Sequence, residues 1–184
     1  MPRKEYAGSL LFGRRRDNRP EPLDRWRLVS DDKVIRDRLG EVIEARSVQV
    51  LLDGADSVHL EMLQWDQSGV VHHCDGFRYL SPLERVGDAC GCPPGIENQK
   101  KDAAIGLGPQ PSVIVSFRVA KFPDLGTFVF RSSSWAFLRA AASLKGDLCM
   151  GAGEILCDLS IEAVELASSG GAVLTYFHPM ILAA

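Results

Sequence analysis

Cysteine and histidine residues gather in two short segments near the middle of this 184-residue sequence. The first segment contains His72, His73 and Cys74, and the second contains Cys90 and Cys92 on either side of a glycine. Zinc in structural sites is bound by four thiolate or imidazole ligands at the corners of a tetrahedron. His72 is a better fourth ligand than His73, because neighbouring residues in a strand point to opposite faces and His73 is adjacent to Cys74. The two segments therefore make a candidate structural zinc site from the three cysteines and His72.

The same residues also allow an interpretation without a metal. Three reduced cysteines can lie beside a flexible loop, and the spacing here differs from that of the common zinc-knuckle motifs. The other two cysteines, Cys149 and Cys157, fall in separate segments. Cys157 alternates with apolar residues in the last predicted hairpin, where a cysteine behaves as a small hydrophobic residue. Both interpretations of the central cluster, with and without zinc, stay open at this point.

The remaining residues give no case for catalysis. Ser133 and Ser134 are better explained as a helix cap than as a nucleophile, because no histidine or acid stands at a spacing typical of a hydrolase triad. Gly151-Ala152-Gly153 lacks the lysine and the helix context of a phosphate-binding loop. His59 alternates with apolar residues and is expected to face solvent. We therefore expect a protein that is not an enzyme, with no small-molecule substrate and no organic cofactor.

Charge is unevenly distributed along the chain. The formal net charge is −3, from 21 Lys and Arg and 24 Asp and Glu. The first 40 residues carry 11 basic and 7 acidic side chains, whereas the rest of the chain carries 10 and 17. A net charge this close to zero argues against a protein whose whole surface binds nucleic acid.

The basic excess is densest at Arg14, Arg15, Arg16 and Arg19, which are followed by two prolines. With few apolar residues to bury, residues 1–22 are predicted to form a flexible N-terminal arm. The arginines of this arm are candidate contacts for DNA phosphates or for an acidic face of a protein partner. A solvated tail without a partner explains the same composition.

The hydrophobic pattern predicts one α+β domain over residues 23–184. Hydrophobic residues make up 46% of the chain, which is enough for one core and too many for a disordered protein. Apolar residues at three- and four-residue spacing predict a helix from Ser30 to about Ala45 and a second from Ser133 or Ser134 to Gly146. Alternating apolar residues predict strands near residues 23–28, 47–52, 58–65, 70–74, 113–120, 127–130, 155–163 and 173–181. Hairpin-linked strands with two helices indicate a mostly antiparallel sheet.

Residues 74–111 interrupt this pattern as an insertion rich in cysteine, proline and glycine. The hydrophobic periodicity disappears from Phe77 to Pro111. A structureless loop of this length is uncommon inside a compact domain. Metal ligation would stabilise such a loop without an apolar core of its own, so we expect an irregular insertion that a metal can hold together.

The sequence shows neither a membrane-spanning segment nor a secretory signal. No apolar run approaches the ~18 residues of a membrane helix, and Met1-Pro2-Arg3-Lys4-Glu5 is not an apolar stretch. Five cysteines are also too sparse for a secreted disulfide scaffold. We therefore expect a cytoplasmic protein without membrane contact.

Five sets of residues, in the same order along the chain, carry a resemblance to a known family. They are Arg25-Trp26-Arg27-Leu28-Val29-Ser30-Asp31; Cys74-Asp75-Gly76 with Cys90-Gly91-Cys92-Pro93; residues 111–120 followed by Pro123-Asp124-Leu125-Gly126-Thr127-Phe128; Ser132-Ser133-Ser134-Trp135; and Tyr176-Phe177-His178-Pro179-Met180. Over about residues 8–182, the chain resembles the recombination directionality factors that actinophages pair with their large serine integrases. The shared order of these segments makes the resemblance specific.

The resemblance implies a protein with no catalytic step. Such factors bind the serine integrase on its attachment-site DNA and switch it from integration to excision. The contact is expected with the zinc-binding domain and coiled-coil region of the integrase rather than through reading of the DNA sequence. The alternative function is that of a direct DNA-binding accessory protein that uses the basic N-terminal arm.

One position departs from the family pattern. The family has a fourth cysteine in a Gly-x-Gly-Cys-x-Pro stretch, and Pro109 stands at that position in Gly106-Leu107-Gly108-Pro109-Gln110-Pro111. The other three cysteines of the pattern are present. A closed metal site would then need His72 or His73 as its fourth ligand.

Overall fold

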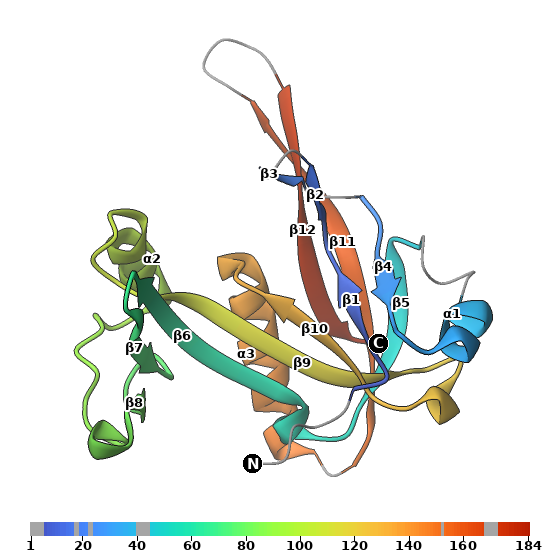
Figure 1. Cartoon of the computed structure of the whole chain (residues 1–184), viewed down its shortest axis with the longest axis horizontal. Coiled ribbons are helices and arrows are strands. Elements are labelled where there is room, and N and C mark those ends of the chain that lie inside the picture. Colours follow the sequence, from blue (N-terminus) through green and yellow to red (C-terminus); the bar gives the residue numbers. More distant parts are fainter. Residues whose placement is uncertain (1–5, 17–18, 22–23, 40–44, 152, 168–172) are drawn as a thin grey trace.

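The molecule is built around one large, mostly antiparallel sheet (Figure 1). The computed structural model describes residues 6–16, 19–21, 24–39, 45–151, 153–167 and 173–184. The strands of the sheet are β1 (Gly8–Leu11), β4 (Arg27–Val29), β5 (Ser47–Leu52), β6 (Val58–Asp66), β7 (Gly69–Cys74), β8 (Tyr79–Ser81), β9 (Gln110–Val119), β10 (Phe128–Ser132), β11 (Ile155–Ala167) and β12 (Val173–Ala183). Their order is β12-β11-β5-β9-β10-β1-β4, and β6, β7 and β8 branch from β9. Among the described strand pairs only β1 and β10 run parallel, so the predicted α+β class is confirmed.

The core lies between the central strands and helix α3 (Trp135–Met150). Trp26 is completely buried, and its ring meets that of Phe130 edge-on at 4.9 Å. Phe130 in turn meets the ring of Phe137 on α3 at 5.0 Å. Buried aromatic pairs in this geometry add to the stabilisation from apolar burial alone. These three rings therefore connect β10 and α3 to the segment that precedes β4.

Helix α3 begins where the sequence predicts and ends later. The Ser134 hydroxyl accepts a hydrogen bond from the Phe137 amide at 3.3 Å, which makes Ser134 the N-cap. The predicted end at Gly146 is wrong, because the helix continues to Met150. Leu144 and Leu148 are both buried, and their burial outweighs the ~1 kcal/mol that a glycine costs inside a helix.

Helix α1 (Lys33–Leu39) is capped by a different residue from the one predicted. The Asp32 carboxylate accepts from the Val34 amide at 2.7 Å, directly before the first helical residue. The Ser30 hydroxyl accepts from the Asp32 amide at 3.2 Å, before the helix begins, and donates to the Ala7 carbonyl at 2.6 Å. Ser30 therefore connects this segment to the residue before β1. The predicted continuation of the helix over 40–44 lies outside the described residues.

The insertion at residues 74–111 is more regular than predicted. It contains β8, a 3-10 turn (Leu83–Arg85) and a third helix, α2 (Ile96–Ala104), so the expected count of two helices is wrong for the part of the chain that the structure describes. Helix α2 lacks an apolar stripe, since its buried residues are only Gln99 and Ala103. The sequence pattern therefore did not reveal it. We call residues 69–109 the cysteine lobe; Figure 1 shows β7, β8 and α2 at one end of the sheet.

The N-terminal segment contributes to the sheet, although the sequence places the start of the folded domain near residue 23. Strand β1 lies between β10 and β4. A Cβ atom at Gly8 would lie 2.7 Å from the Val29 carbonyl oxygen, so only glycine allows this close pairing. Beyond β1, β2 (Arg14–Arg16) and β3 (Arg19–Glu21) form a separate two-stranded ribbon.

No helix in the described part of the chain is both long and apolar enough to cross a membrane.

Candidate metal centre

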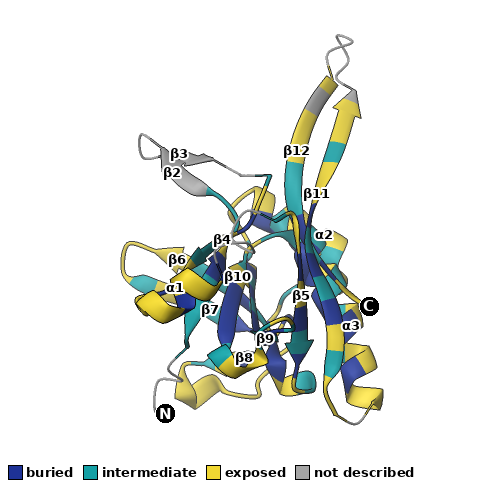
Figure 2. Cartoon of the chain, turned by 90° about the vertical axis from the view of Figure 1, so that its right-hand side faces the viewer, coloured by how far each residue is buried: buried dark blue, intermediate teal, exposed yellow. Residues whose placement is uncertain are grey.

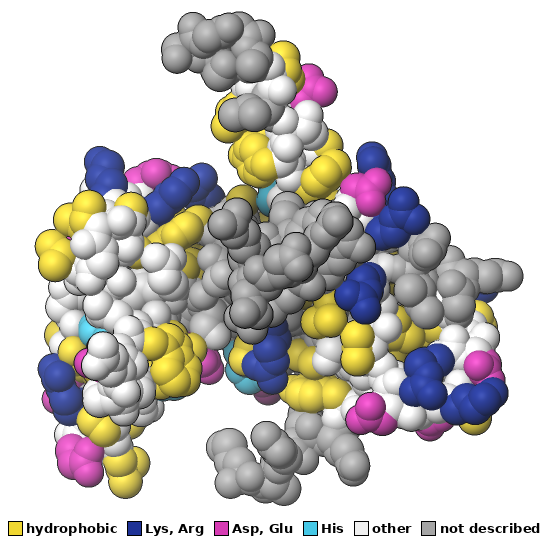
Figure 3. All heavy atoms as spheres, turned by 45° about the horizontal axis from the view of Figure 1, so that its top comes forward, with side chains coloured by type: hydrophobic (Ala, Val, Ile, Leu, Met, Phe, Trp, Pro, Cys, Tyr) yellow, Lys and Arg dark blue, Asp and Glu magenta, His cyan; other side chains and the backbone are white. Residues whose placement is uncertain are grey.

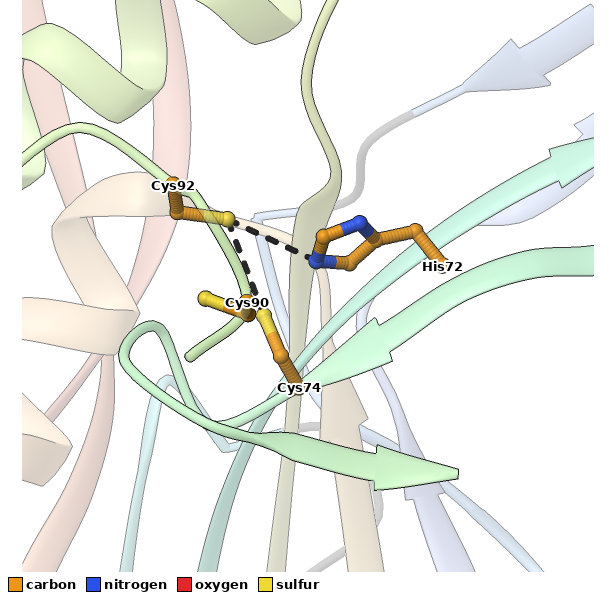
Figure 4. A group of neighbouring side chains, drawn as sticks. All are labelled: His72, Cys74, Cys90 and Cys92. Carbon is orange, nitrogen blue, oxygen red and sulfur yellow. Dashed lines mark hydrogen bonds between the residues drawn. The ribbon is translucent and has the colours of Figure 1, made fainter. Parts of the chain in front are cut away.

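Three cysteines and one histidine meet inside the cysteine lobe (Figure 4). The side chains are those of His72, Cys74, Cys90 and Cys92, and their ligand atoms all lie within 4.8 Å of one another. Cys74 and Cys90 are buried, and His72 and Cys92 are half-buried. The sequence separates these residues into two segments, and the fold places them together.

Strand geometry explains why His72 joins the cluster and His73 does not. His72 and Cys74 are two positions apart in β7, so their side chains share one face of the strand, and His73 points to the other. Cys90 and Cys92 lie in the loop that leads into α2. Gly91 between them has φ of 80°, a left-handed conformation that glycine adopts without strain.

Two separations between ligand atoms fit a tetrahedral ion. The Sγ atoms of Cys74 and Cys92 are 3.7 Å apart, and the Cys92 Sγ lies 3.5 Å from the His72 Nε2. Zinc bonds of about 2.3 Å to sulfur and about 2.0–2.1 Å to nitrogen place two tetrahedral ligand atoms about 3.6–3.8 Å apart. The four side chains could therefore hold a zinc-sized cation.

Without a cation, the electrostatics of the cluster favour neutral thiols over bare thiolates. Burial raises the pKa of the Cys74 thiol to about 11 and also raises the pKa of Cys92 above its usual value. Burial lowers the pKa of His72, with the Arg85 guanidinium contributing, so the imidazole is kept neutral and able to ligate. A bound cation stabilises thiolates, and its binding releases the thiol protons. The Gly76 amide, which lies 3.3 Å from the Cys74 Sγ, also favours the thiolate.

Helix α2 supports the loop that follows Cys74. Gln99 is buried, and its amide nitrogen donates to the Gly76 carbonyl at 3.2 Å. The Cys90 amide donates to the Phe77 carbonyl at 2.9 Å and joins the two cysteine segments. Sequence reasoning missed Gln99, because nothing in a polar helix marks one glutamine as buried. These hydrogen bonds hold the ligand loops in place.

A hydrogen-bond chain crosses the other face of β7. His73 Nδ1 lies 3.0 Å from the Ser81 hydroxyl, and its Nε2 lies 3.2 Å from the Glu61 carboxylate. Glu61, His73 and Ser81 come from β6, β7 and β8, and His73 is directly opposite Ser81 in the register. We interpret these hydrogen bonds as a connection that holds the three strands together. The sequence could not show them, because they depend on the register of the strands.

Two sets of predicted residues are not members of the cluster. Pro109, at the family's fourth cysteine position, is a buried residue just before β9, and His72 completes the group of four donors instead. The arginine-rich segment forms the β2–β3 ribbon, in which Arg16 is opposite Arg19 and Arg14 is opposite Glu21. The fold does not bring this ribbon into the metal cluster.

A protein-family model described as Gp3-like, recombination directionality factor-like, matches residues 7–165 of the chain. The matched segment includes all four residues of the cluster. No solved structure matches the chain.

Proposed function

The chain belongs to the Gp3-like, recombination directionality factor-like family, and we propose that it binds a phage or prophage serine integrase on attachment-site DNA and biases recombination toward excision. The observation that carries this proposal is the family match over residues 7–165, which runs from the start of the sheet into β11. In this proposal the protein is an accessory factor that acts in the cytoplasm, without a catalytic step of its own.

The bias requires only differential binding. A factor that binds the excision arrangement of the integrase–DNA complex more tightly than the integration arrangement shifts the equilibrium by the ratio of the two affinities. Moving the ratio of the two arrangements from about 1:99 to about 99:1 takes an affinity difference of about 10⁴-fold. An extended interaction surface can supply this difference without a reactive group.

The metal in this proposal is zinc, with a structural role. His72, Cys74, Cys90 and Cys92 have the donor types of a closed four-ligand site, and the distances from the Cys92 Sγ to Cys74 and to His72 fit such a site. Closed sites leave no position for a substrate or an activated water, unlike catalytic zinc. Zinc would stabilise the cysteine lobe, in which Phe77, Leu83 and Leu107 are exposed and so do not contribute to a core.

Direct DNA contact is a second candidate, favoured by the β2–β3 ribbon. Four of its six strand residues are arginine, namely Arg14, Arg15, Arg16 and Arg19. A two-stranded ribbon is one of the elements that enter the major groove of B-DNA. In the integrase complex such a ribbon would add phosphate contacts and make binding sensitive to salt.

Native gel electrophoresis tests the two candidates together. The purified chain is added to attachment-site DNA alone, to the serine integrase of the same genome alone, and to the integrase–DNA complex. A supershift that requires integrase supports the main proposal. A shift of DNA without integrase that disappears when Arg14, Arg15, Arg16 and Arg19 become alanine supports the second candidate. If adding the chain changes the migration of none of the three samples, both candidates are contradicted.

A further inference from the structure

The last hairpin of the chain extends beyond the sheet that holds its base. Strand β5 pairs with β11 only over residues 155–160, whereas β11 and β12 pair with each other from Cys157 to Ala167. We call the outer part, from the pair Glu162 and His178 to the pair Ala167 and Val173, the β11–β12 arm. Figures 1 and 2 show this arm projecting away from the rest of the molecule.

Both edges of the arm lack a neighbouring strand among the described residues. β12 is the last strand in the sheet order, and β11 has no partner other than β12 after it leaves β5. An isolated two-stranded hairpin is at best marginally stable in water. Unpaired strand edges also attract further chains unless they are covered. A projecting arm of six residue pairs, about 20 Å long, therefore has the properties of a docking element.

Both faces of the arm carry exposed apolar side chains. Leu166, Val173 and Tyr176 are 54%, 61% and 46% exposed. Leu166 and Tyr176 belong to one face of the ribbon and Val173 to the other, because side chains alternate along each strand and pairs in register share a face. Figure 3 shows hydrophobic side chains gathered along the arm. A ribbon with this pattern is suited to burial on both faces.

The arm carries acidic side chains and no Lys or Arg. Between residues 162 and 178 the sequence contains Glu162 and Glu165 and no Lys or Arg. His178 lies 3.8 Å from the Glu162 carboxylate, so the one imidazole of the arm sits beside this acid. A matching surface is therefore apolar with basic residues at its rim. Proteins that bind DNA carry such basic surfaces.

We propose that the β11–β12 arm docks into an apolar groove with a basic rim on the DNA-bound integrase. The assignment rests on the proposed function and names the element that carries it. DNA itself does not fit the arm, since a phosphate backbone would meet two carboxylates and no cation. A second copy of the chain fits poorly, because a contact between two arms would bring together the carboxylates of both copies, and the arm contains no Lys or Arg to offset them.

Affinity for the integrase–DNA complex, measured by fluorescence anisotropy on labelled attachment-site DNA, tests the arm. The double variant Leu166→Asp, Tyr176→Asp is expected to bind at least about tenfold more weakly, because it places uncompensated charge in an apolar contact. The matched control is Leu83→Asp, Val86→Asp, which makes the same change at exposed residues of the cysteine lobe. An unchanged melting temperature shows that each variant folds.

Charge reversal supplies a second variant that leaves the apolar contacts in place. Glu162→Lys, Glu165→Lys is expected to weaken binding at low salt, and the difference from the wild type should shrink as salt rises. The control reverses Glu84 and Asp88, two exposed acids of the cysteine lobe.

The outcomes distinguish failure of the arm assignment from failure of the proposed function. If the wild type binds the integrase complex and both arm variants bind it equally well, the arm assignment is wrong and the proposed function stays in place. Arm variants that abolish self-association of the chain without changing integrase binding also overturn the arm assignment. A wild-type chain that does not bind the integrase complex contradicts the proposed function, and the arm assignment fails with it.

Discussion

The Sγ atoms of Cys74 and Cys92 lie 3.7 Å apart, although Cys74 ends strand β7 and Cys92 lies in the loop before α2. Two sulfurs joined in a disulfide would be about 2.05 Å apart, so both thiols remain available as ligands. The separation is close to that of two sulfurs on one tetrahedral zinc. A metal bound here would connect the two ends of the segment that contains β8.

Zinc content gives the first prediction. The purified protein should contain one zinc per chain, and Cys90→Ser should lose it. Removing a ligand should weaken zinc binding by more than the ~10–100-fold that loss of an outer hydrogen-bond partner costs. Elemental analysis after dialysis against a chelator measures how much zinc each protein retains. The matched control is Cys149→Ser, since Cys149 is exposed and outside the cluster. Wild-type protein without zinc would contradict a metal role for these residues.

Gln99 gives a prediction about the support of the site. Gln99→Leu removes the donor to the Gly76 carbonyl and leaves a buried acceptor unsatisfied. The free energy of unfolding should fall by about 1–3 kcal/mol, which is the usual cost of such a group. Urea unfolding of the zinc-loaded protein measures the change. Lys100→Leu, at the next and exposed position of α2, should stay within about 0.5 kcal/mol of the wild type. Equal effects of the two substitutions would show that the Gln99 hydrogen bond contributes nothing.

Cys157 gives a prediction about alkaline pH. Burial raises the pKa of its thiol from 9.0 to about 11, with the Asp158 carboxylate adding to the effect. The folded state therefore keeps the proton at pH values where the unfolded state loses it. This contribution to stability is complete below pH 9.0 and is lost as the pH rises through about 11.

A comparison of two alanine variants separates the contribution of the Cys157 thiol to the pH dependence of stability from that of other groups. Between about pH 9 and about pH 11, the free energy of unfolding of zinc-loaded Cys157→Ala should fall less steeply than that of the wild type. Cys149→Ala should keep the wild-type slope, because Cys149 is exposed. Urea unfolding at several pH values provides the slopes, and parallel curves for Cys157→Ala and the wild type would count against the assignment.

The central strands were predictable because each buries one face. Val48, Val50 and Leu52 of β5 alternate with polar or less buried residues, and the structure buries all three. Ser134 could also be identified as an N-cap, since a serine before an apolar helix has a local role. An element whose hydrophobic period matches its structure can be predicted without information about the neighbouring elements.

The elements that support the cluster were not predictable in the same way. Helix α2 buries Gln99 and Ala103 and has no apolar stripe. Strand β8 has three residues, too few for a period. The contacts of His73 with Glu61 and Ser81 depend on the register of three strands. The donor types of the metal cluster could be read from the sequence, whereas their mutual distances required the fold.

A recombination assay shows whether the chain sets the direction in which the integrase works. The serine integrase of the same genome is incubated with the two hybrid attachment sites that flank an integrated element, with and without the purified chain, and the excised product is quantified. Excision is expected only when the chain is present, together with reduced integration between the two original attachment sites. Equal product in both directions with and without the chain, under conditions in which the integrase alone performs integration, would contradict the proposed function.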